Sequence, residues 1–412
     1  MAQLHAMISC YKSPRIPIKM TIISSSLNTE NRVQNNLELV SSNGIRGSST
    51  VGLYAMNGGE GPNSYAQNSS YQRGVIEVAK PILEEEIDSK FDIKNITSST
   101  TLNSFRIADF GSSTGHNSFP AMQIITKAIE EKFKTEGGNI NTASRLPDFQ
   151  VFFNDQVMND FNTLFNSLPL ERQYYTAGVP GPFHGRLFPK SSLHFAYCSC
   201  ALNWLSDVPE AVLDETSSAW NKARVHYTGA REQVFDAYKN QYAKDIESFL
   251  EARAEELISG GLMALLVPAV PSFTGSETTF TTPIEMDLIG SCLVDMAKKG
   301  TLSEAKVDSF NFPLYFTIPQ ELRAMIERNR SFSIERTEIL NNPGKLSVTS
   351  SSARSTYLRA VFEGLLVNHF GSEIMDELFD RYTKKLEASP IFADPSNEKS
   401  IIIFVLLKRK FE

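Results

Sequence analysis

Short apolar runs that alternate with helical segments dominate the chain from about residue 52 onward. Each run has the length and residue types of a buried strand, and the intervening segments place apolar residues at helical spacing. The expected strands are Phe105–Phe110, Phe149–Phe153, Ser192–Tyr197, Leu262–Val267 and Ile401–Leu407. The expected helices are Ser69–Lys90, a segment that ends at Phe133, and Glu232–Ile258 with Gly260 and Gly261 as its stop signal. This alternation predicts an α/β fold with a mainly parallel sheet covered on both faces.

Two segments depart from this pattern. The first 50 residues contain five basic and two acidic residues, a net charge of +3, whereas the whole chain carries −7. For residues 1–51 we expect a disordered tail or a transit peptide, and therefore a cytoplasmic protein or a plastid or mitochondrial one. Residues 283–397 are mostly helical in pattern, without a comparable central strand. We expect residues 52–282, completed by a strand within 398–410, to form the main domain and 283–397 to form a helical cap.

The composition excludes several classes of protein. A balance of 47 acidic against 40 basic residues argues against a broad basic surface for nucleic acid. Four cysteines without a C-x-x-C pair argue against a disulfide scaffold and a structural zinc site. Strand alternation should point Cys198 and Cys200 the same way. The longest apolar stretch, Ile401–Leu407, is too short to span a membrane.

A turn rich in glycine and serine, Asp109-Phe-Gly-Ser-Ser-Thr-Gly-His-Asn117, joins the first expected strand to a helix. Gly111 and Gly115 allow the backbone to turn tightly and approach a ligand, with helix N–H groups just beyond. Such a turn at the carboxyl end of a parallel strand is typical of nucleotide-like cofactor sites, although plain connections also contain glycine. The turn has neither the G-x-G-x-x-G spacing nor a Walker lysine, so phosphate binding is poorly supported.

A second acid, Asp155, also ends an expected strand. Its carboxylate could accept hydrogen bonds from both ribose hydroxyls of an adenosine, or it could cap the following helix. The two acids and the turn, without a basic phosphate cradle, fit S-adenosylmethionine, whose sulfonium is cationic.

Trp204 follows the third strand and either forms the wall of a pocket or fills the core. His226 is more often structural than a base.

A series of motifs, in order, resembles the plant SABATH methyltransferases over about residues 52–412. The motifs are Met56-Asn-Gly-Gly-Glu-Gly-Pro-Asn-Ser-Tyr65 with Asn68-Ser69 and Gln72, Ile107-Ala-Asp-Phe-Gly111, Phe153-Asn-Asp155, Gly178-Val-Pro-Gly181, Asn203-Trp-Leu-Ser206 and Asp308-Ser-Phe-Asn311. Within the family, Arg224-Val-His-Tyr-Thr-Gly229 and residues 249–258 are most similar to the carboxyl methyltransferases that include those for loganic and farnesoic acids.

The resemblance implies a class I methyltransferase fold, a Rossmann-like sheet with an α-helical cap, that forms methyl esters of small plant carboxylic acids. It implies a homodimer in plant specialised metabolism, with S-adenosylmethionine as cofactor and no nucleic-acid or membrane partner. The implied cofactor residues are Tyr65, Ser69, Asp109, Gly111, Asn117, Asp155, Gln156, Pro182 and Phe183. Gln72 and Trp204 would position the substrate carboxylate. The substrate pocket would include Cys200, Asn203 and His226. A metal site, suited to Mg²⁺, would fall on Asn221, Asp308, Phe310 and Asn311.

Several positions depart from the family pattern. Ser112 and His116 replace the usual Cys and Pro of the turn, and Pro182 replaces a Ser beside the adenine. Cys200 replaces a common Tyr, and Asn203 replaces a His or Met. The last two changes leave smaller side chains on the pocket wall, so they bear on which acid is accepted. The alternatives are N-methylation of a purine-like alkaloid and a non-catalytic relative that binds cofactor or acid.

Overall fold

The computed structural model describes residues 55–93, 104–136, 146–272, 280–344, 350–394 and 397–411. The expected N-terminal tail lies outside these ranges. Residues 49–412 form one compact unit. None of the described helices is long and apolar enough to cross a membrane.

Seven strands form one sheet in the order β3-β2-β1-β4-β5-β7-β6. Strands β1 to β5 pair in parallel, and β7 is antiparallel to both of its neighbours. The strands are β1 (Ser104–Phe110), β2 (Asp148–Asp155), β3 (Tyr175–Pro180), β4 (Leu193–Ser199), β5 (Leu257–Ala269), β6 (Phe332–Leu340) and β7 (Ile401–Arg409). The mainly parallel sheet expected from the sequence is therefore confirmed.

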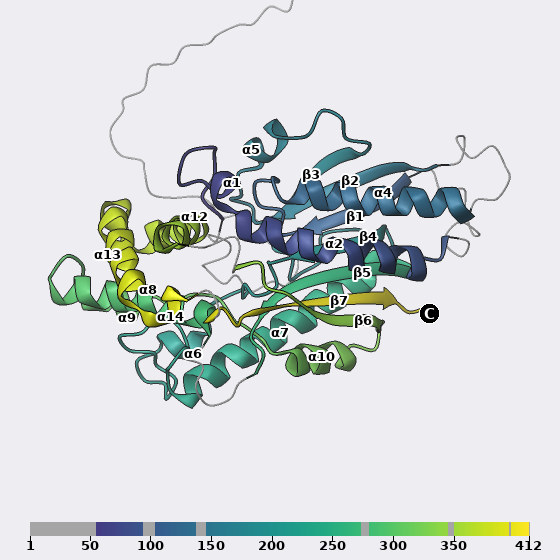
Figure 1. Ribbon diagram of the computed structural model, residues 1–412. Helices are drawn as coiled ribbons and strands as arrows, with labels where there is room; N and C mark the ends of the chain where they lie inside the picture. Colours follow the sequence, from purple (N-terminus) through teal and green to yellow (C-terminus); the bar gives the residue numbers. More distant parts are fainter. Residues whose placement is uncertain are drawn as a thin grey trace, which may run out of the picture. The chain divides into compact units, whose positions relative to one another are not determined.

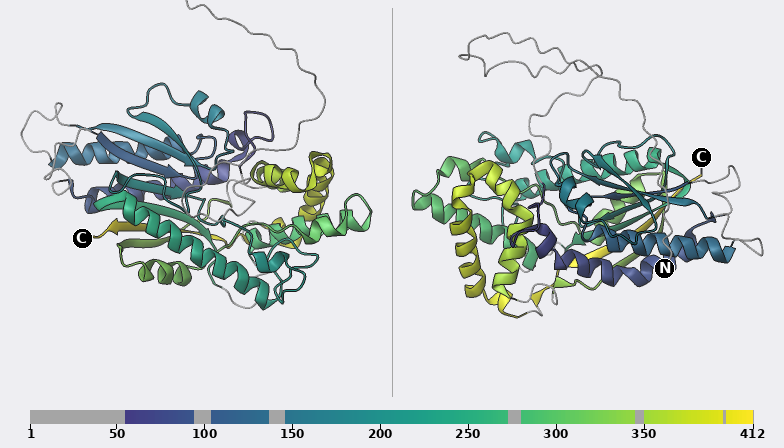
Figure 2. Two further views of the ribbon diagram at one scale, coloured as in Figure 1. Left: turned by 180° about the vertical axis from the view of Figure 1, so that it is seen from behind. Right: turned by 90° about the horizontal axis from the view of Figure 1, so that it is seen from above.

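Helices cover both faces of this sheet (Figures 1 and 2). One apolar cluster packs α2 (Ser70–Lys90) and α4 (Ser118–Glu136) against one face, and a second packs α7 (Glu232–Glu256) and α10 (Pro319–Arg328) against the other. The burial of β4 and β7 explains their continuous apolar runs, because a strand covered on both faces has no side that prefers water. The short helices α1 (Tyr65–Asn68), α5 (Phe161–Asn166) and α6 (Glu210–Leu213) lie in connections.

A third apolar cluster holds the remaining helices together at one end of the sheet (Figure 1). Its main members are α8 (Thr281–Lys298), α12 (Ser351–Phe370) and α13 (Met375–Ala388). The shorter elements are α9 (Glu304–Asp308), η3 (Ser372–Ile374) and α14 (Pro390–Ala393). We refer to residues 280–318 and 350–394 as the helical cap.

The structure differs from the sequence expectations in three places. The edge strands β3 and β6 were not expected, and β6 with α10 lies inside the range assigned to the cap although both pack with the sheet. Gly260 and Gly261 do not end a helix. Helix α7 ends at Glu256, and both glycines lie within β5 where its register with β4 shifts. Gly260 has a φ of +79°, which suits a bulge in the strand.

The turn after β1 has a conformation that only glycine adopts without strain. Gly111 has a φ of +84°, and a Cβ there would come 2.4 Å from the Cβ of Ala201. This close approach packs the turn against the segment after β4. The expectation that Gly111 serves a tight turn is confirmed.

We predict that Gly111→Ala lowers the free energy of unfolding by about 2 kcal/mol or more, because both overpacking and a left-handed backbone are unfavourable. Chemical denaturation followed by circular dichroism measures the change. Gly61→Ala is the matched control, because no atom lies within 4 Å of its added Cβ. Equal stability of both variants would contradict the prediction.

Candidate functional site

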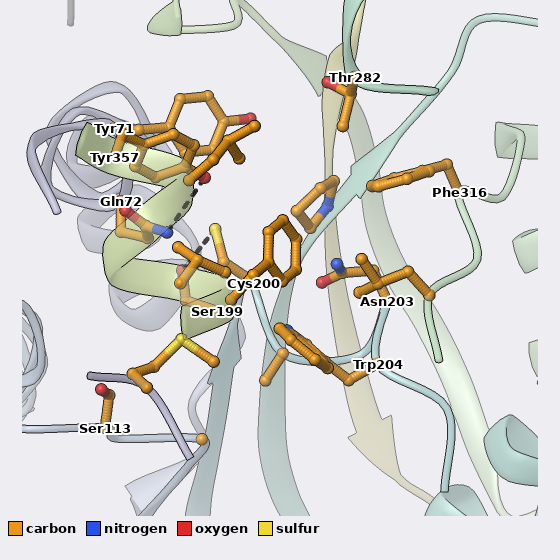
Figure 3. Close-up of a pocket in the computed structure, with 18 of the residues that line it drawn as sticks. Tyr71, Gln72, Ser113, Ser199, Cys200, Asn203, Trp204, Thr282, Phe316 and Tyr357 are labelled. Atoms are coloured by element: carbon orange, nitrogen blue, oxygen red, sulfur yellow. Dashed lines mark hydrogen bonds between the residues drawn. The ribbon is translucent and has the colours of Figure 1, made fainter. Parts of the chain in front are cut away.

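A cavity opens where the strand order of the sheet reverses. β1 and β4 are neighbours, but the chain runs outward to β2 and β3 on one side and to β5 on the other. The cavity is lined by residues at the carboxyl ends of these strands and by the cap (Figure 3). Such a switch point is where open α/β sheets bind ligands. The residues that line it include Tyr65, Tyr71, Gln72, Gly111, Ser113, Asp155, Gln156, Phe183, His184, Cys200, Asn203, Trp204, Phe316 and Tyr357.

Asp155 connects the ends of β1 and β2. Its Oδ2 accepts a hydrogen bond from the backbone N–H of Ser113 at 2.7 Å, and its Oδ1 accepts one from Gln156 N–H at 2.7 Å. Burial raises the pKa of this carboxyl to about 6, although the two backbone donors oppose the rise. Because each oxygen has a second lone pair, the carboxylate can still accept two more hydrogen bonds from a ligand in the cavity.

Asp109 lies within β1 and does not line the cavity. It is 2% exposed, and its Oδ2 has no hydrogen-bond partner in the described part of the chain. Burial raises its pKa to about 7; the Ser118 hydroxyl opposes this rise and the nearby Asp155 carboxylate reinforces it. Asp109 thus lies behind the turn as a buried carboxyl group and not in the cavity wall.

Gln72 and Trp204 face the middle of the cavity from opposite sides (Figure 3). The Nε2 of Gln72, on α2, donates to the Tyr357 hydroxyl of α12 at 3.4 Å. The indole of Trp204 packs against Phe362, with 5.8 Å between ring centroids. The Oε1 of Gln72 and the Oδ1 of Asn203 are buried without a hydrogen-bond partner among the described residues. This part of the cavity therefore offers neutral polar groups.

Cys200 directly follows β4, and its backbone turns away from the strand. Its φ is +55°, which costs a residue with a side chain about 1 kcal/mol or more. The expected common direction of Cys198 and Cys200 is therefore wrong: Cys198 packs with the α7 side of the sheet and Cys200 with the α2 side. The Cys200 side chain lies in the cavity wall, where burial raises the pKa of the thiol to about 12. The thiol is thus a neutral wall group at neutral pH.

Nine of the residues expected at the site line the cavity. They are Tyr65, Gln72, Gly111, Asp155, Gln156, Phe183, Cys200, Asn203 and Trp204. Ser69, Asp109, Asn117 and Pro182 do not line it. Asn117 instead donates through Nδ2 to the Ser69 hydroxyl at 2.8 Å, which ties the start of α2 to the turn after β1.

His226, expected in the substrate pocket, does not line the cavity. The imidazole is buried outside the cavity lining, with Nδ1 2.7 Å from the Thr228 hydroxyl and Nε2 3.1 Å from the Leu314 carbonyl oxygen. Burial lowers its pKa to about 3, so it stays neutral. Both ring nitrogens are engaged, and the residue supports the segment that carries Leu314.

The four residues expected at a metal come together away from the cavity. Asn221 donates through Nδ2 to the Asn311 Oδ1 at 2.6 Å, and the Asp308 Oδ1 accepts from Ala223 N–H at 2.8 Å. The Tyr238 hydroxyl also donates to the Asn311 Oδ1, at 3.3 Å. Two of the oxygens that a magnesium ion would need, the Asn311 Oδ1 and the Asp308 Oδ1, thus already accept hydrogen bonds from the protein. The described residues contain no group of three or more His, Cys, Asp or Glu that could hold a metal. In this conformation the residues bind one another, and a magnesium ion held by the Asn311 Oδ1 would have to displace the Asn221 amide.

The cap contributes residues that the sequence did not single out. One face of α12 lines the cavity through Arg354, Tyr357, Leu358, Val361 and Phe362, at helical spacing. Glu285 and Met286 of α8 and Glu398 before β7 also line it. The only signal in the sequence was the helical periodicity of the cap, which does not tell which face meets a ligand.

Comparison with known proteins agrees with this architecture. The family model for SAM dependent carboxyl methyltransferases matches residues 52–410. Loganic acid O-methyltransferase from Catharanthus roseus is 43% identical over 87% of this chain and 95% of its own length. Farnesoic acid carboxyl-O-methyltransferase from Arabidopsis thaliana is 39% identical over 81% of this chain and 92% of its own length.

A solved structure of loganic acid methyltransferase with SAH superimposes with a TM-score of 0.81, over 87% of this chain and 99% of that one. The expected class I methyltransferase fold and the SABATH resemblance are confirmed. The chain belongs to the family of S-adenosylmethionine-dependent carboxyl methyltransferases.

Proposed function

We propose that the cavity binds S-adenosylmethionine over the ends of β1 and β2 and a small plant carboxylic acid between Gln72 and Trp204, and that the enzyme forms the methyl ester. The observation that carries this proposal is the cavity itself. It joins a hydrogen-bond acceptor for ribose, Asp155, to a region of neutral polar groups at Gln72, Asn203 and Trp204.

The cofactor end is built for a neutral sugar and a cationic centre. Asp155 keeps two free lone pairs for the ribose hydroxyls, and Gln156, Phe183 and Tyr65 also line the cavity. Ser69 and Asn117 hold the turn in place through their hydrogen bond. The Ser expected beside the adenine is Pro182 here, so that position contributes no side-chain donor.

The acceptor end orients a carboxylate without needing a base. A carboxyl group with an ordinary pKa of about 4 is already ionised at neutral pH. If the Gln72 amide rotates by half a turn, its Oε1 can accept a hydrogen bond from the Tyr357 hydroxyl. The amide N–H groups then point toward one oxygen of the substrate carboxylate. The Trp204 N–H would donate to the substrate carboxylate from the other side. The second oxygen then attacks the methyl carbon as the S–CH₃ bond breaks and its electron pair passes to sulfur. S-adenosylmethionine supplies the methyl group, and the protein supplies position and exclusion of water.

The proposed homodimer rests on exposed apolar side chains between β2 and β3. Val157, Met158, Leu170 and Tyr175 are 62%, 62%, 97% and 66% exposed. Large apolar side chains in contact with water are typical of surfaces that another chain covers. A cation at Asn221, Asp308, Phe310 and Asn311 would act on the fold and not on the reaction, because none of these residues lines the cavity.

Incubation with methyl-labelled S-adenosylmethionine and a panel of plant carboxylic acids, with a purine alkaloid included, tests the proposal. We expect labelled methyl ester from at least one acid and none from the purine. Label on a purine nitrogen would support N-methylation instead. Cofactor binding without transfer to any acceptor would support a non-catalytic binding protein.

We predict that Trp204→Phe lowers kcat/KM for the acid about 10- to 100-fold, because a hydrogen bond to a charged group contributes about 1.5–3 kcal/mol. The SAH dissociation constant should stay unchanged, since the ring is retained and the cofactor end is built by other residues. Trp220→Phe is the matched control, because the other tryptophan of the chain lies outside this cavity. A parallel loss of SAH affinity in Trp204→Phe would overturn the assignment.

We predict that SAH affinity is constant above about pH 7 and falls below about pH 6. Burial raises the Asp155 pKa to about 6, and ribose hydroxyls favour the ionised carboxylate. Binding must therefore release a proton at low pH, which weakens affinity by up to about tenfold per pH unit. Isothermal titration calorimetry in buffers of different ionisation enthalpy measures both affinity and released protons.

Asp155→Asn should bind SAH more weakly and lose this pH dependence. Asp148→Asn, at the opposite and exposed end of the same strand, is the matched control and should keep both. A flat pH profile in the unaltered protein would contradict the role of Asp155.

A further inference from the structure

A buried ionic cluster lies in the cap wall of the cavity. It consists of Arg354, Glu285 and Glu398, and we call it the cap cluster. Arg354 Nη1 lies 2.5 Å from the Glu285 Oε1, and Nη2 lies 3.5 Å from the Glu398 Oε2. The three side chains are only 13%, 4% and 6% exposed, yet all three residues line the cavity. Charged groups buried beside a cavity are costly, so their position there needs a reason.

The cap cluster contains two carboxyl groups and one guanidinium. Arg354 is the only Lys or Arg among the described residues that line the cavity, and it is already paired with both carboxylates. Burial raises the pKa of Glu285 to about 7, although Arg354 opposes the rise. The cluster therefore has a net charge between zero and −1 at neutral pH. Such a wall repels a second carboxylate and accepts hydrogen bonds from neutral donors.

Hydroxyl groups surround the cluster. The Thr281 hydroxyl donates to the Glu398 Oε1, which also accepts from Ser400 N–H at 3.3 Å. The hydroxyls of Thr282 and Ser400 lie 2.9 Å apart, and both residues line the cavity. The cap also contributes apolar residues to the cavity lining, namely Met286, Leu314, Phe316 and Phe362. The cap part of the cavity thus combines apolar side chains with the polar groups of the cluster.

The cluster is displaced from the residues that hold the substrate carboxylate. Tyr357, which bonds Gln72, follows Arg354 by three residues on the same face of α12. At about 1.5 Å of rise per residue, the two positions are about 4.5 Å apart along the helix axis. An acid held by Gln72 and Trp204 can therefore extend past Tyr357 toward the cluster.

We propose that the preferred acceptor acid carries a hydroxyl group remote from its carboxylate, and that Glu285 and Glu398 bind this hydroxyl while Arg354 holds both carboxylates in place. Glu285 and Glu398 are thus specificity-determining residues for methyl transfer. The inference rests on the proposed function, because it assumes that Gln72 and Trp204 hold the reacting carboxylate.

The preference for a remote hydroxyl group can be tested with straight-chain acids from hexanoic to dodecanoic acid. Each acid is used in three forms: unsubstituted, ω-hydroxylated, and as the α,ω-dicarboxylic acid. These forms differ only at the far end. At the best chain length we expect kcat/KM for the ω-hydroxy acid to exceed that of the unsubstituted acid about tenfold or more, as for a hydrogen bond to a charged group. The dicarboxylic acid should be the poorest acceptor. Equal use of the three forms would overturn the inference and leave the proposed function intact.

Glu285→Gln and Glu398→Gln should each reduce the ratio of ω-hydroxy to unsubstituted acid and improve use of the dicarboxylic acid. Glu377→Gln is the matched control, since Glu377 also pairs with an arginine of the cap, Arg381, but does not line the cavity. It should keep the ratio of the unaltered enzyme. SAH binding to each variant verifies that the cofactor end remains folded.

Calorimetric binding of the same acids to the protein–SAH complex separates the two proposals. Preferential binding of ω-hydroxy acids that depends on Glu398, without methylation of any acid, would support the inference and contradict the proposed function. An unchanged preference in both glutamine variants would overturn the inference whether or not the acids are methylated.

Discussion

The cavity depends on a buried ion pair at the end of α7. Arg253 and Glu256 have fully buried side chains, and the guanidinium Nε donates to the carboxylate at 2.7 Å. Arg253 also donates to the carbonyl oxygens of Phe183 at 2.7 Å and Gly185 at 2.9 Å, and the Glu256 Oε1 accepts from Phe188 N–H at 3.0 Å. The loop that carries Phe183 is thereby held from both sides. Removal of one partner from such a pair costs about 3–5 kcal/mol, because the other charge stays buried.

The same pair connects this loop to the centre of the sheet. The guanidinium lies 4.2 Å from the ring centroid of Phe110, the last residue of β1, where it gains a cation–π interaction. Directly beyond, the N–H groups of Gly111 and Ser112 both donate to the Asn154 carbonyl oxygen at 2.9 Å, and the Asn154 side chain donates to Val179 and Gly181. The ends of β1, β2 and β3 are therefore fixed by hydrogen bonds that involve the main chain. The cofactor end can then keep its shape when side chains elsewhere change.

The sequence predicted the elements whose signals are local. Continuous apolar runs identified β1, β2, β4, β5 and β7, because strands buried on both faces need no polar side. The sequence did not predict β3 (YTAGVP) and β6 (FSIERTEIL), because they contain polar or small residues. Both strands lie at the edges of the sheet, where many of their residues are partly exposed to water. The sequence does not distinguish a helix end from a bulge at Gly260, because both favour a positive φ. Pairing with a distant strand decides such cases, and local patterns do not contain it.

In the site, too, residues with a local sequence signal were predictable and residues brought together by distant contacts were not. Asp155, Gly111 and Cys200 were predictable because they follow strand ends, and strand ends of a parallel sheet meet at one edge. The cap cluster was not predictable from the sequence, because Glu285, Arg354 and Glu398 are far apart in the chain and belong to no local motif. The resemblance does not reveal that His226 lies outside the cavity lining, because it gives the position along a chain but not which way a side chain faces. The two ends of the cavity thus follow different rules: main-chain hydrogen bonds define the cofactor end, whereas side chains of the cap and of positions 200 and 203 define the acceptor end. Substitutions at the acceptor end can therefore change the acid that is bound without loss of the hydrogen bonds that form the cofactor end.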